Sequence, residues 1–509
     1  MTNRHKKNKA PDIQIGQGVL ELLSSAMYIN PLTLFREYIQ NAVDAIDDAV
    51  TNNQLASYRD GRIDITLDQN ERRIVIRDNG TGLTNKAFAT TMLTIGDSPK
   101  RDTTARGFRG IGRLAGLGYA QQVIFRGRST GDPDVMEILW DGHALKQLLT
   151  TNTHTENLET LIQQAVTVTS RPAHEAPPHF FEVELVKPRR ITNDILMNEV
   201  EIAVYLGQVA PCPFAPAFSH GAEISNLLKA YGHASRTYAI YINDTETPLY
   251  RPYRNSLPQS AKLTNTLHTL VPFTIAGLDG DPAAIGWRLH HDYLGAVPAK
   301  SGVRGVRARI GNMQVGGERL LADMFAEDRF WAWSIGEIHI LDPRIRPNGR
   351  RDAFESNTHL DNILHHLRPI GADIARHCRV SSQKRNRLKT FTTAANKIHN
   401  TLGILQQGAV SRSFTQTAQT DITNLLADMR KAADFAIFDT QEEQDRLTRQ
   451  LTEIETEVAR EENSYESTPF AHRPTKLRPA YQEMIDLIYS CSTNPATARA
   501  LVDRILERL

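Results

Sequence analysis

Cysteine is scarce in this sequence of 509 residues. Its three cysteines, Cys212, Cys378 and Cys491, lie far apart in the chain. This spacing argues against a disulfide framework and against a cysteine-based zinc cluster. The seventeen histidines show no metal-ligand spacing either. The composition therefore favours a cytoplasmic protein without a structural metal centre.

Long apolar runs and an excess of one charge are also missing. No run approaches the roughly twenty apolar residues that a membrane-spanning helix needs, so we expect no membrane association. The basic start lacks the apolar core of a signal peptide, and we interpret residues 1–12 as a basic flexible tail. The net charge is +1. Such a balance does not by itself require a nucleic-acid partner.

The segment from Pro31 to Ile46 has the periodicity of an amphipathic helix. Its apolar residues at 35, 38, 39, 42, 43 and 46 recur with helical spacing. Glu37, Asn41 and Asp44 lie at i, i+4 and i+7, so they share one face beside the apolar stripe. A polar stripe of this kind is equally typical of a cleft edge and of a solvated helix face. The helix alone does not decide between them.

A predicted β-hairpin follows and ends in a glycine-rich turn. Residues 62–67 and 73–77 alternate as two antiparallel strands. Asp78 ends the second strand, and Gly80 and Gly82 follow it in the turn. A carboxylate at a strand end can accept a hydrogen bond from the amine of adenine, and glycines let the backbone approach the base. An ordinary Asp-Asn-Gly turn is the alternative.

A second glycine motif places Gly107, Gly110 and Gly112 before a predicted helix at residues 113–119. Backbone N–H groups at a helix start favour phosphate oxygens. The Rossmann interpretation fails because the motif follows a turn and a long loop instead of opening a βα unit, and no Walker motif is present. In this order, the three motifs predict a nucleotide site with a metal ligand, an adenine acceptor and a phosphate cradle.

The same motifs resemble those of the GHKL ATPases, the superfamily of gyrase, the ninety-kilodalton heat-shock chaperones, histidine kinases and MutL. Residues 35–45 resemble its N box, and the two glycine motifs resemble its glycine boxes. The resemblance implies a Bergerat-type α/β sandwich that binds ATP with Mg²⁺. It makes Glu37 the general base, Asn41 the Mg²⁺ ligand and Asp78 the adenine contact. The further nucleotide-binding residues that it implies are Asp44, Gly80, Gly82, Lys100, Gly107, Arg109, Gly110, Ile111 and Gly112.

The resemblance also implies a lid over the nucleotide at residues 84–106. Residues 95–100 are similar to a lid segment of chaperone-like and MORC-like members. One feature departs from the family, whose members often have Gly-Thr before the last strand of this domain. The strand at residues 179–185 has phenylalanine instead, which questions the water-mediated adenine contact but not the contact of Asp78.

A second resemblance concerns residues 335–355, which are similar to the middle domain of heat-shock-chaperone-like members. There, an Asn-x-x-Arg-acid loop touches the γ-phosphate. This alignment implies Arg351 as the transition-state cation, with Arg350 as the second choice. Lys300 is a rival, because gyrase- and MutL-like members carry a phosphate-sensing lysine in a loop. A basic surface loop is the alternative for the arginines near this position.

The predicted fold is an α/β multidomain chain with three parts. Residues 13–190 form the ATP-binding domain, residues 191–355 a transducer-like middle domain with a linker helix, and residues 356–509 a helical region. A heptad spacing in the helical region fits either a coiled coil or packing within the chain; it is formed by Leu447, Leu451, Ile454 and Val458.

The sequence thus predicts a Mg²⁺-dependent ATPase that acts as an ATP-gated clamp. By the middle-domain resemblance it is chaperone-like and acts on a client polypeptide. The resemblance to the family implies a homodimer joined by the C-terminal helices. Two alternatives stay open. A MORC- or MutL-like nucleic-acid clamp would use Arg304, Arg307 and Arg309 or the loop at residues 344–351. An ATP-sensing scaffold would bind nucleotide without hydrolysing it.

Overall fold

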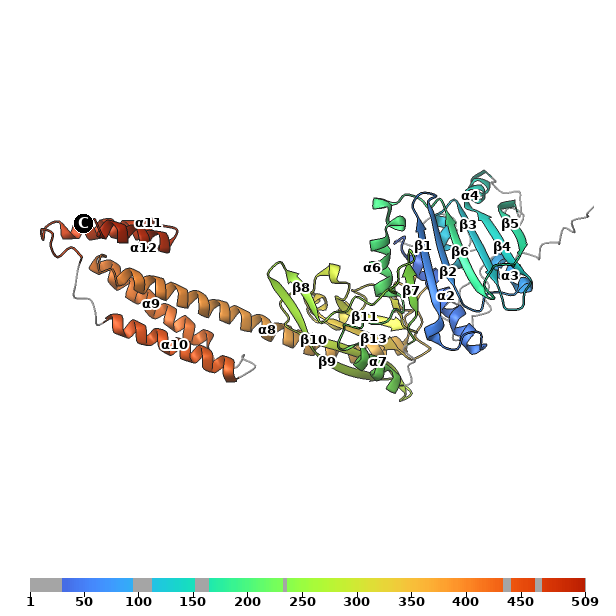
Figure 1. Cartoon of the computed structure of the whole chain (residues 1–509). Helices are drawn as coiled ribbons and strands as arrows, with labels where there is room; N and C mark the ends of the chain where they lie inside the picture. Colours follow the sequence, from blue (N-terminus) through green and yellow to red (C-terminus); the bar gives the residue numbers. More distant parts are fainter. Residues whose placement is uncertain are drawn as a thin grey trace, which may run out of the picture. The chain divides into compact units, whose positions relative to one another are not determined.

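The computed structural model describes residues 30–94, 112–151, 164–231, 236–433, 441–462 and 469–508 (Figure 1). The chain divides into two compact units, residues 1–375 and 376–509. Two mixed sheets with their helices make up the first unit, and the second unit is helical. The predicted α/β multidomain class with a helical C-terminal region is confirmed. The tail at residues 1–12 lies outside the described residues.

The first sheet has seven strands in the order β5-β4-β3-β6-β2-β1-β7. Their bounds are β1 Arg62–Asp68, β2 Arg73–Asp78, β3 Gln122–Arg128, β4 Asp134–Asp141, β5 Val166–Pro172, β6 Phe180–Val186 and β7 Ala239–Ile242. The predicted hairpin is confirmed, since β1 pairs antiparallel with β2 and Ile65 lies opposite Ile76. In contrast, β7 runs parallel to β1 at the sheet edge.

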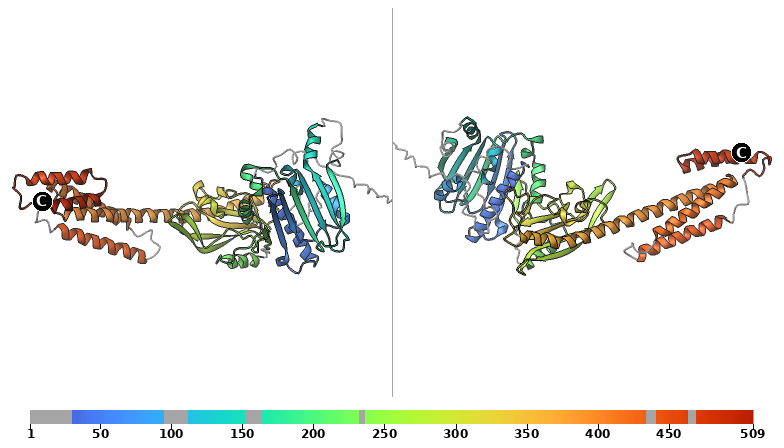
Figure 2. Two further views of the ribbon diagram at one scale, coloured as in Figure 1. Left: turned by 45° about the horizontal axis from the view of Figure 1, so that its top comes forward. Right: turned by 180° about the vertical axis from the view of Figure 1, so that it is seen from behind.

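Helix α2 (Thr33–Thr51) packs against this sheet alongside β1 and β2 (Figure 2). Its apolar stripe is fully buried, with Leu34, Phe35, Ile39 and Val43 at 0% exposure. The other helical segments are α3 Asn85–Leu93, α4 Gly142–Thr151 and α6 Glu199–Val209, with the 3₁₀ turns η1 Tyr58–Asp60, η2 Gly112–Gly118 and η3 Thr192–Met197. The apolar period of the sequence therefore marks the core side of α2.

The core of the first sheet continues beyond residue 190, where the sequence placed the end of the ATP-binding domain. Ile202 and Leu206 of α6 and Ile240 of β7 belong to the same buried cluster as α2. The strand β7 joins the sheet only after an intervening helix, α7 (Gly221–Ala230). A four-residue strand this far along the chain carries too short a pattern to be assigned to a sheet from sequence.

The second sheet has six strands in the order β12-β11-β13-β10-β9-β8. Their bounds are β8 Ser256–Ser260, β9 Leu263–Ala276, β10 Pro282–His291, β11 Gly305–Ile310, β12 Met313–Val315 and β13 Ile335–Ile340. Short 3₁₀ turns are η4 Ala299–Ser301, η5 Ala322–Met324 and η6 Asp328–Trp333. Trp287 on β10 is fully buried in the core on this sheet. The loop that carries Arg351 leaves the sheet after β13.

The helices beyond the second sheet are α8 Thr358–Leu405, α9 Arg412–Ala432, α10 Gln441–Glu462, α11 Arg478–Cys491 and α12 Pro495–Leu506. Helix α8 begins in the first unit and continues into the second. The heptad residues Leu447, Ile454 and Val458 of α10 are buried in the core of the helical unit, so they pack within the chain. Among the described residues, no helix combines the length and apolarity that crossing a membrane requires.

Candidate functional site

The polar stripe of α2 faces inward. Glu37 and Asp44 are only 6% and 5% exposed, and Asn41 is half-buried. Asn41 lines a small cavity together with Asp78. The residue after Asp44, Ala45, accepts a hydrogen bond from the Thr81 N–H at 3.0 Å through its carbonyl oxygen. The helix therefore forms one wall of a cleft, and the predicted N-box residues lie beside the first glycine turn.

Asp78 ends β2 as a buried carboxyl group. Its Oδ1 accepts a hydrogen bond of 2.9 Å from the Gly80 N–H. Burial raises the pKa of Asp78 to about 7, because desolvation outweighs the Gly80 N–H and the positive charge of Arg77. Near neutral pH the group is thus divided between an acceptor-only carboxylate and a neutral acid that can also donate.

The glycines of the first turn are required by close packing. A Cβ on Gly80 would lie 2.6 Å from the backbone carbon of Ala45. Gly82 has a φ of +67°, and a Cβ there would lie 1.9 Å from the Arg128 carbonyl oxygen. A side chain at either position would push the turn away from α2 or from β3. The two glycines hold Asp78 against α2.

Gly112 brings the second glycine motif to the Glu37 carboxylate. A Cβ on Gly112 would lie 2.3 Å from Glu37 Oε2, so only glycine fits beside this group. The Tyr38 hydroxyl oxygen accepts a hydrogen bond of 2.9 Å from the Gly116 N–H, which ties η2 to α2. The other predicted phosphate-loop and lid residues lie outside the described residues; they are Lys100, Gly107, Arg109, Gly110 and Ile111. The first part of the predicted lid is helix α3, with Phe88 buried in the core.

The cavity beside Asp78 has a volume of about 20 Å³, which is room for about one water molecule. It is lined by Tyr38, Asn41, Ala42, Ile76, Asp78, Arg113, Phe125, Phe181 and Val183. Phe181 lies opposite Asp78 in the strand register, so the phenylalanine noted as a departure from the family does reach this place. A nucleotide base can enter only if side chains that line the cavity move.

Arg113 also lines this cavity, and its guanidinium donates to the carbonyl oxygens of Thr91 and Thr94. The N–H···O distance to Thr94 is 2.9 Å. Burial lowers the pKa of Arg113 to about 10. Sequence reasoning missed this residue, although its position directly after the glycine motif was a usable signal.

Arg351 reaches α2 from the loop after β13. Its Nε lies 3.2 Å from Glu37 Oε1, and its Nη1 donates to Gln40 Oε1. The neighbouring Arg36 donates from Nη2 to the Gln314 carbonyl oxygen at 2.5 Å. The structure thus brings the predicted arginine to the predicted base. Sequence reasoning missed Arg36 and Gln40, and their place within one turn of Glu37 was the only signal for them.

The two other predicted cations lie elsewhere. Arg350 is exposed although it adjoins Arg351. Lys300 is exposed on η4. The ion pair at Glu37 is made by Arg351.

The arginines of β11 are used inside the protein. Arg309 is 1% exposed and pairs with Glu337 at 2.7 Å, and Glu337 pairs with Arg251 at the same distance. Burial acts to raise the pKa of Glu337, but the charges of Arg251 and Arg309 outweigh it and hold the pKa well below its usual range. Arg307 is 4% exposed and Arg304 pairs with Glu318. The side chains of Arg307 and Arg309 are therefore not available to a nucleic acid.

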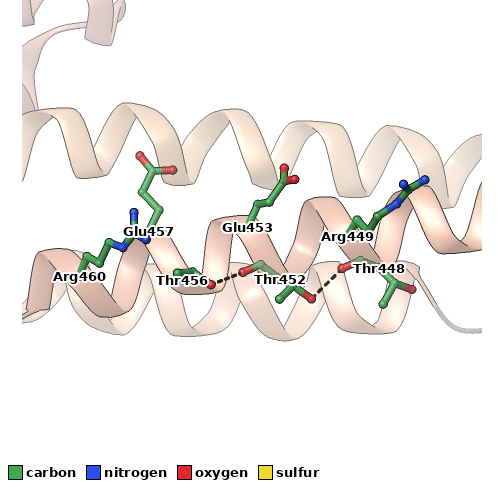
Figure 3. A pocket seen from close by; sticks show the side chains of 7 residues that line it. All are labelled: Thr448, Arg449, Thr452, Glu453, Thr456, Glu457 and Arg460. Atoms are coloured by element: carbon green, nitrogen blue, oxygen red, sulfur yellow. Dashed lines mark hydrogen bonds between the residues drawn. The ribbon is translucent and has the colours of Figure 1, made fainter.

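A wide groove of about 620 Å³ lies along α10 in the helical unit (Figure 3). Its lining residues come from this one helix; they are Thr448, Arg449, Thr452, Glu453, Thr456, Glu457 and Arg460. The hydroxyls of Thr452 and Thr456 donate to backbone carbonyls one turn earlier, at 2.9 and 2.7 Å. A polar surface of a single helix lacks the converging groups of a ligand site.

Comparison with known proteins assigns the first motifs to a family. Residues 33–170 match the family described as histidine kinase-, DNA gyrase B- and HSP90-like ATPase. This segment is a GHKL ATPase domain. The match contains Glu37, Asn41, Asp78 and Gly112, and it ends well before Arg351.

Three curated relatives of the GHKL domain are bacterial proteins named chaperone protein HtpG. The one from Rickettsia canadensis is 29% identical over 174 residues, which are 31% of this chain and 27% of that protein. The one from Rickettsia akari is 28% identical with the same shares. The one from Rickettsia bellii is 26% identical over 169 residues, 30% of this chain and 27% of that protein. The match thus spans about a quarter of these relatives.

Proposed function

We propose that this chain is a Mg²⁺-dependent ATPase, converting ATP and water to ADP and phosphate, and that it works as an ATP-gated dimeric clamp with chaperone-like action. The observation that supports this best is the meeting of three parts of the chain at Glu37. Helix α2 carries the carboxylate, Gly112 packs against it, and Arg351 pairs with it from the loop after β13.

The side chains at the cleft fit MgATP. Asn41 lines the cavity and carries an amide oxygen, the hard type of ligand that Mg²⁺ accepts. Gly112 has no Cβ to keep its backbone away from the Glu37 carboxylate, so the end of the second glycine motif lies beside the proposed base. We assign the adenine to Asp78 and the Mg²⁺ to Asn41. The remaining nucleotide contacts are proposed at Asp44, Gly80, Gly82, Lys100, Gly107, Arg109, Gly110, Ile111 and Gly112.

The chain's own residues then divide the work of hydrolysis. Glu37 accepts a proton from the attacking water, as a positioned general base does. Arg351 supplies positive charge to the developing negative charge of the terminal phosphate. When bound, Mg²⁺ neutralises part of the phosphate charge. Arg350 and Lys300 remain the alternative cations of this proposal.

The clamp action is proposed from the similarity to the HtpG proteins, which are named as chaperones. We accordingly propose a client polypeptide as the partner, a homodimer joined by C-terminal helices and a cytoplasmic location. The burial of Arg307 and Arg309 removes two of the three arginines, Arg304, Arg307 and Arg309, that a nucleic-acid clamp would use. A nucleic-acid clamp would then have to use the arginines of the loop at residues 344–351.

Steady-state ATP hydrolysis by wild type, Glu37→Gln and Glu37→Ala tests the proposal. We expect both variants to bind ATP and to lose turnover by about 100-fold or more, the usual contribution of a general base. Glu71→Gln is the matched control, because this glutamate is exposed in the turn between β1 and β2. Hydrolysis at the wild-type rate in the Glu37 variants would contradict the assignment of the base.

The same assay separates the classes of partner when it is repeated with an unfolded polypeptide and with double-stranded DNA. Stimulation by the polypeptide is the expected result. Salt-sensitive stimulation by DNA alone would favour the nucleic-acid clamp. Binding of ATP by wild type without turnover under any condition would favour the scaffold.

A further inference from the structure

The guanidinium of Arg351 has two side-chain partners on α2. Its Nε pairs with Glu37 Oε1 at 3.2 Å, and its Nη1 donates to Gln40 Oε1. Gln40 follows Glu37 by three positions, so both side chains lie on the same face of the helix. Gln40 is only 1% exposed. Because water does not reach a side chain this buried, its amide oxygen depends on a protein donor.

The backbone of Arg351 adopts a conformation that needs surrounding contacts to hold it. Its φ of 58° lies in the left-handed region, which a residue with a Cβ rarely adopts. Its carbonyl oxygen accepts hydrogen bonds from the Gly316 N–H at 2.9 Å and from Arg36 Nη1 at 3.4 Å. A strained conformation of this kind persists when the surrounding contacts fix it. The guanidinium contacts on α2 are part of what holds this loop tip, so losing one of them should loosen the loop as well as the side chain.

We propose that Gln40 is a positioning residue for Arg351, which rests on the proposed ATPase function. Its amide oxygen holds one edge of the guanidinium, so that another edge faces Glu37. Glutamine suits this role because it accepts a hydrogen bond without adding a second negative charge beside Glu37. A planar guanidinium with two fixed partners is confined in both place and orientation. Gln40 acts through Arg351 and does not itself touch the reacting atoms.

A double-variant cycle in the full-length chain tests the coupling. Gln40→Met keeps the length and packing of the side chain and removes the acceptor. We expect its kcat to fall about tenfold or more, the usual loss for a hydrogen bond to a charged group. Its ATP affinity should stay within about twofold of wild type, because the residue binds no nucleotide. Combining Gln40→Met with Arg351→Ala should give no further loss beyond Arg351→Ala alone.

Amide hydrogen exchange of the nucleotide-free protein supplies a readout that does not need hydrolysis. In Gln40→Met, the amides of Gly316 and residues 347–354 should exchange faster, as they should in Arg351→Ala. Gln121→Met is the matched control, because Gln121 is an exposed glutamine that lies just before β3. Its exchange pattern should equal that of wild type at the loop.

The outcomes separate this inference from the proposed function. Unchanged exchange at the loop in Gln40→Met, or kcat losses that multiply in the double variant, would overturn the positioning role. Faster loop exchange in Gln40→Met together with a wild-type protein that does not hydrolyse ATP would overturn the ATPase proposal. In that case Gln40 would still be shown to hold Arg351.

Discussion

Arg351 and Glu37 form an ion pair with 3.2 Å between Nε and Oε1, and their side chains are 13% and 8% exposed. Glu37 lies on helix α2, and Arg351 lies in the loop that follows β13 of the second sheet. A buried charge that loses its partner is costly. The contributions of Glu37 and Arg351 to stability are therefore coupled even in the nucleotide-free protein. A substitution of one residue changes the free-energy contribution of the other.

Arg351→Ala should abolish most ATP hydrolysis while nucleotide binding persists. Arginines that stabilise a transferring phosphate contribute about 10³-fold or more to turnover. Arg350→Ala changes the same residue type one position earlier, where the side chain is exposed, and should cost much less. Rate measurements with both variants decide between the two arginines. A larger loss in Arg350→Ala would reverse our assignment.

Gly112→Ala should displace the Glu37 carboxylate, because the added Cβ would lie 2.3 Å from Oε2. A misplacement of about 1 Å in a catalytic group costs about 100-fold in rate. Gly118→Ala is the control on the same 3₁₀ turn, since a Cβ there meets nothing within 4 Å. Turnover and circular dichroism of the two variants test this point. Equal rates in the two variants would show that ATP hydrolysis does not depend on the position of the Glu37 carboxylate.

Asp78→Asn should stabilise the nucleotide-free protein at alkaline pH. The folded pKa of about 7 lies above the ordinary value of 3.8, so the stability contribution of Asp78 is full below about pH 4 and is lost as pH rises through 7. The difference corresponds to on the order of 4 kcal/mol. Asparagine does not ionise and lacks this loss. Thermal unfolding between pH 5 and pH 8.5 should show that the stability of the variant relative to wild type increases with pH. A constant difference would contradict the raised pKa of Asp78.

Asp78→Asn should weaken ATP binding, although it should stabilise the nucleotide-free protein. Asp78→Asn replaces an acceptor-only group by an amide that presents donors as well. We expect ATP affinity to fall by about tenfold or more, the usual effect of losing a charged hydrogen-bond partner. Calorimetric titration with ATP at pH 8 measures it. Unaltered affinity would argue against an adenine contact at Asp78.

Glu337→Gln should destabilise the first unit by about 3 kcal/mol or more, since it leaves Arg251 and Arg309 buried without their counter-ion. Asp328→Asn is a control that breaks an exposed pair with Arg319; such pairs contribute about 0–1 kcal/mol. Thermal unfolding compares the two variants. Similar melting temperatures would mean that the buried cluster contributes little to stability.

The sequence predicted several local features that the structure contains. The period of α2, the hairpin of β1 and β2, and the turn after Asp78 depend on neighbouring residues, so their patterns are visible along the chain. The order of the motifs also indicated the GHKL family before any fold was known. Separation along the chain hid other features. Gln40 carries no pattern of its own, and its partner Arg351 lies in another segment.

What the sequence determined by itself was the kind of domain at residues 33–170 and the residue types of its cleft. The tertiary structure alone decided that β7 completes the first sheet and that Arg351 meets Glu37. It also decided that Arg307 and Arg309 are buried while Arg350 and Lys300 are exposed. The loop after β13 contains four arginines that the sequence alone does not distinguish: Arg344, Arg346, Arg350 and Arg351. Which of them reaches α2 depends on backbone geometry, including the left-handed φ of Arg351, and on long-range packing that local preference does not encode.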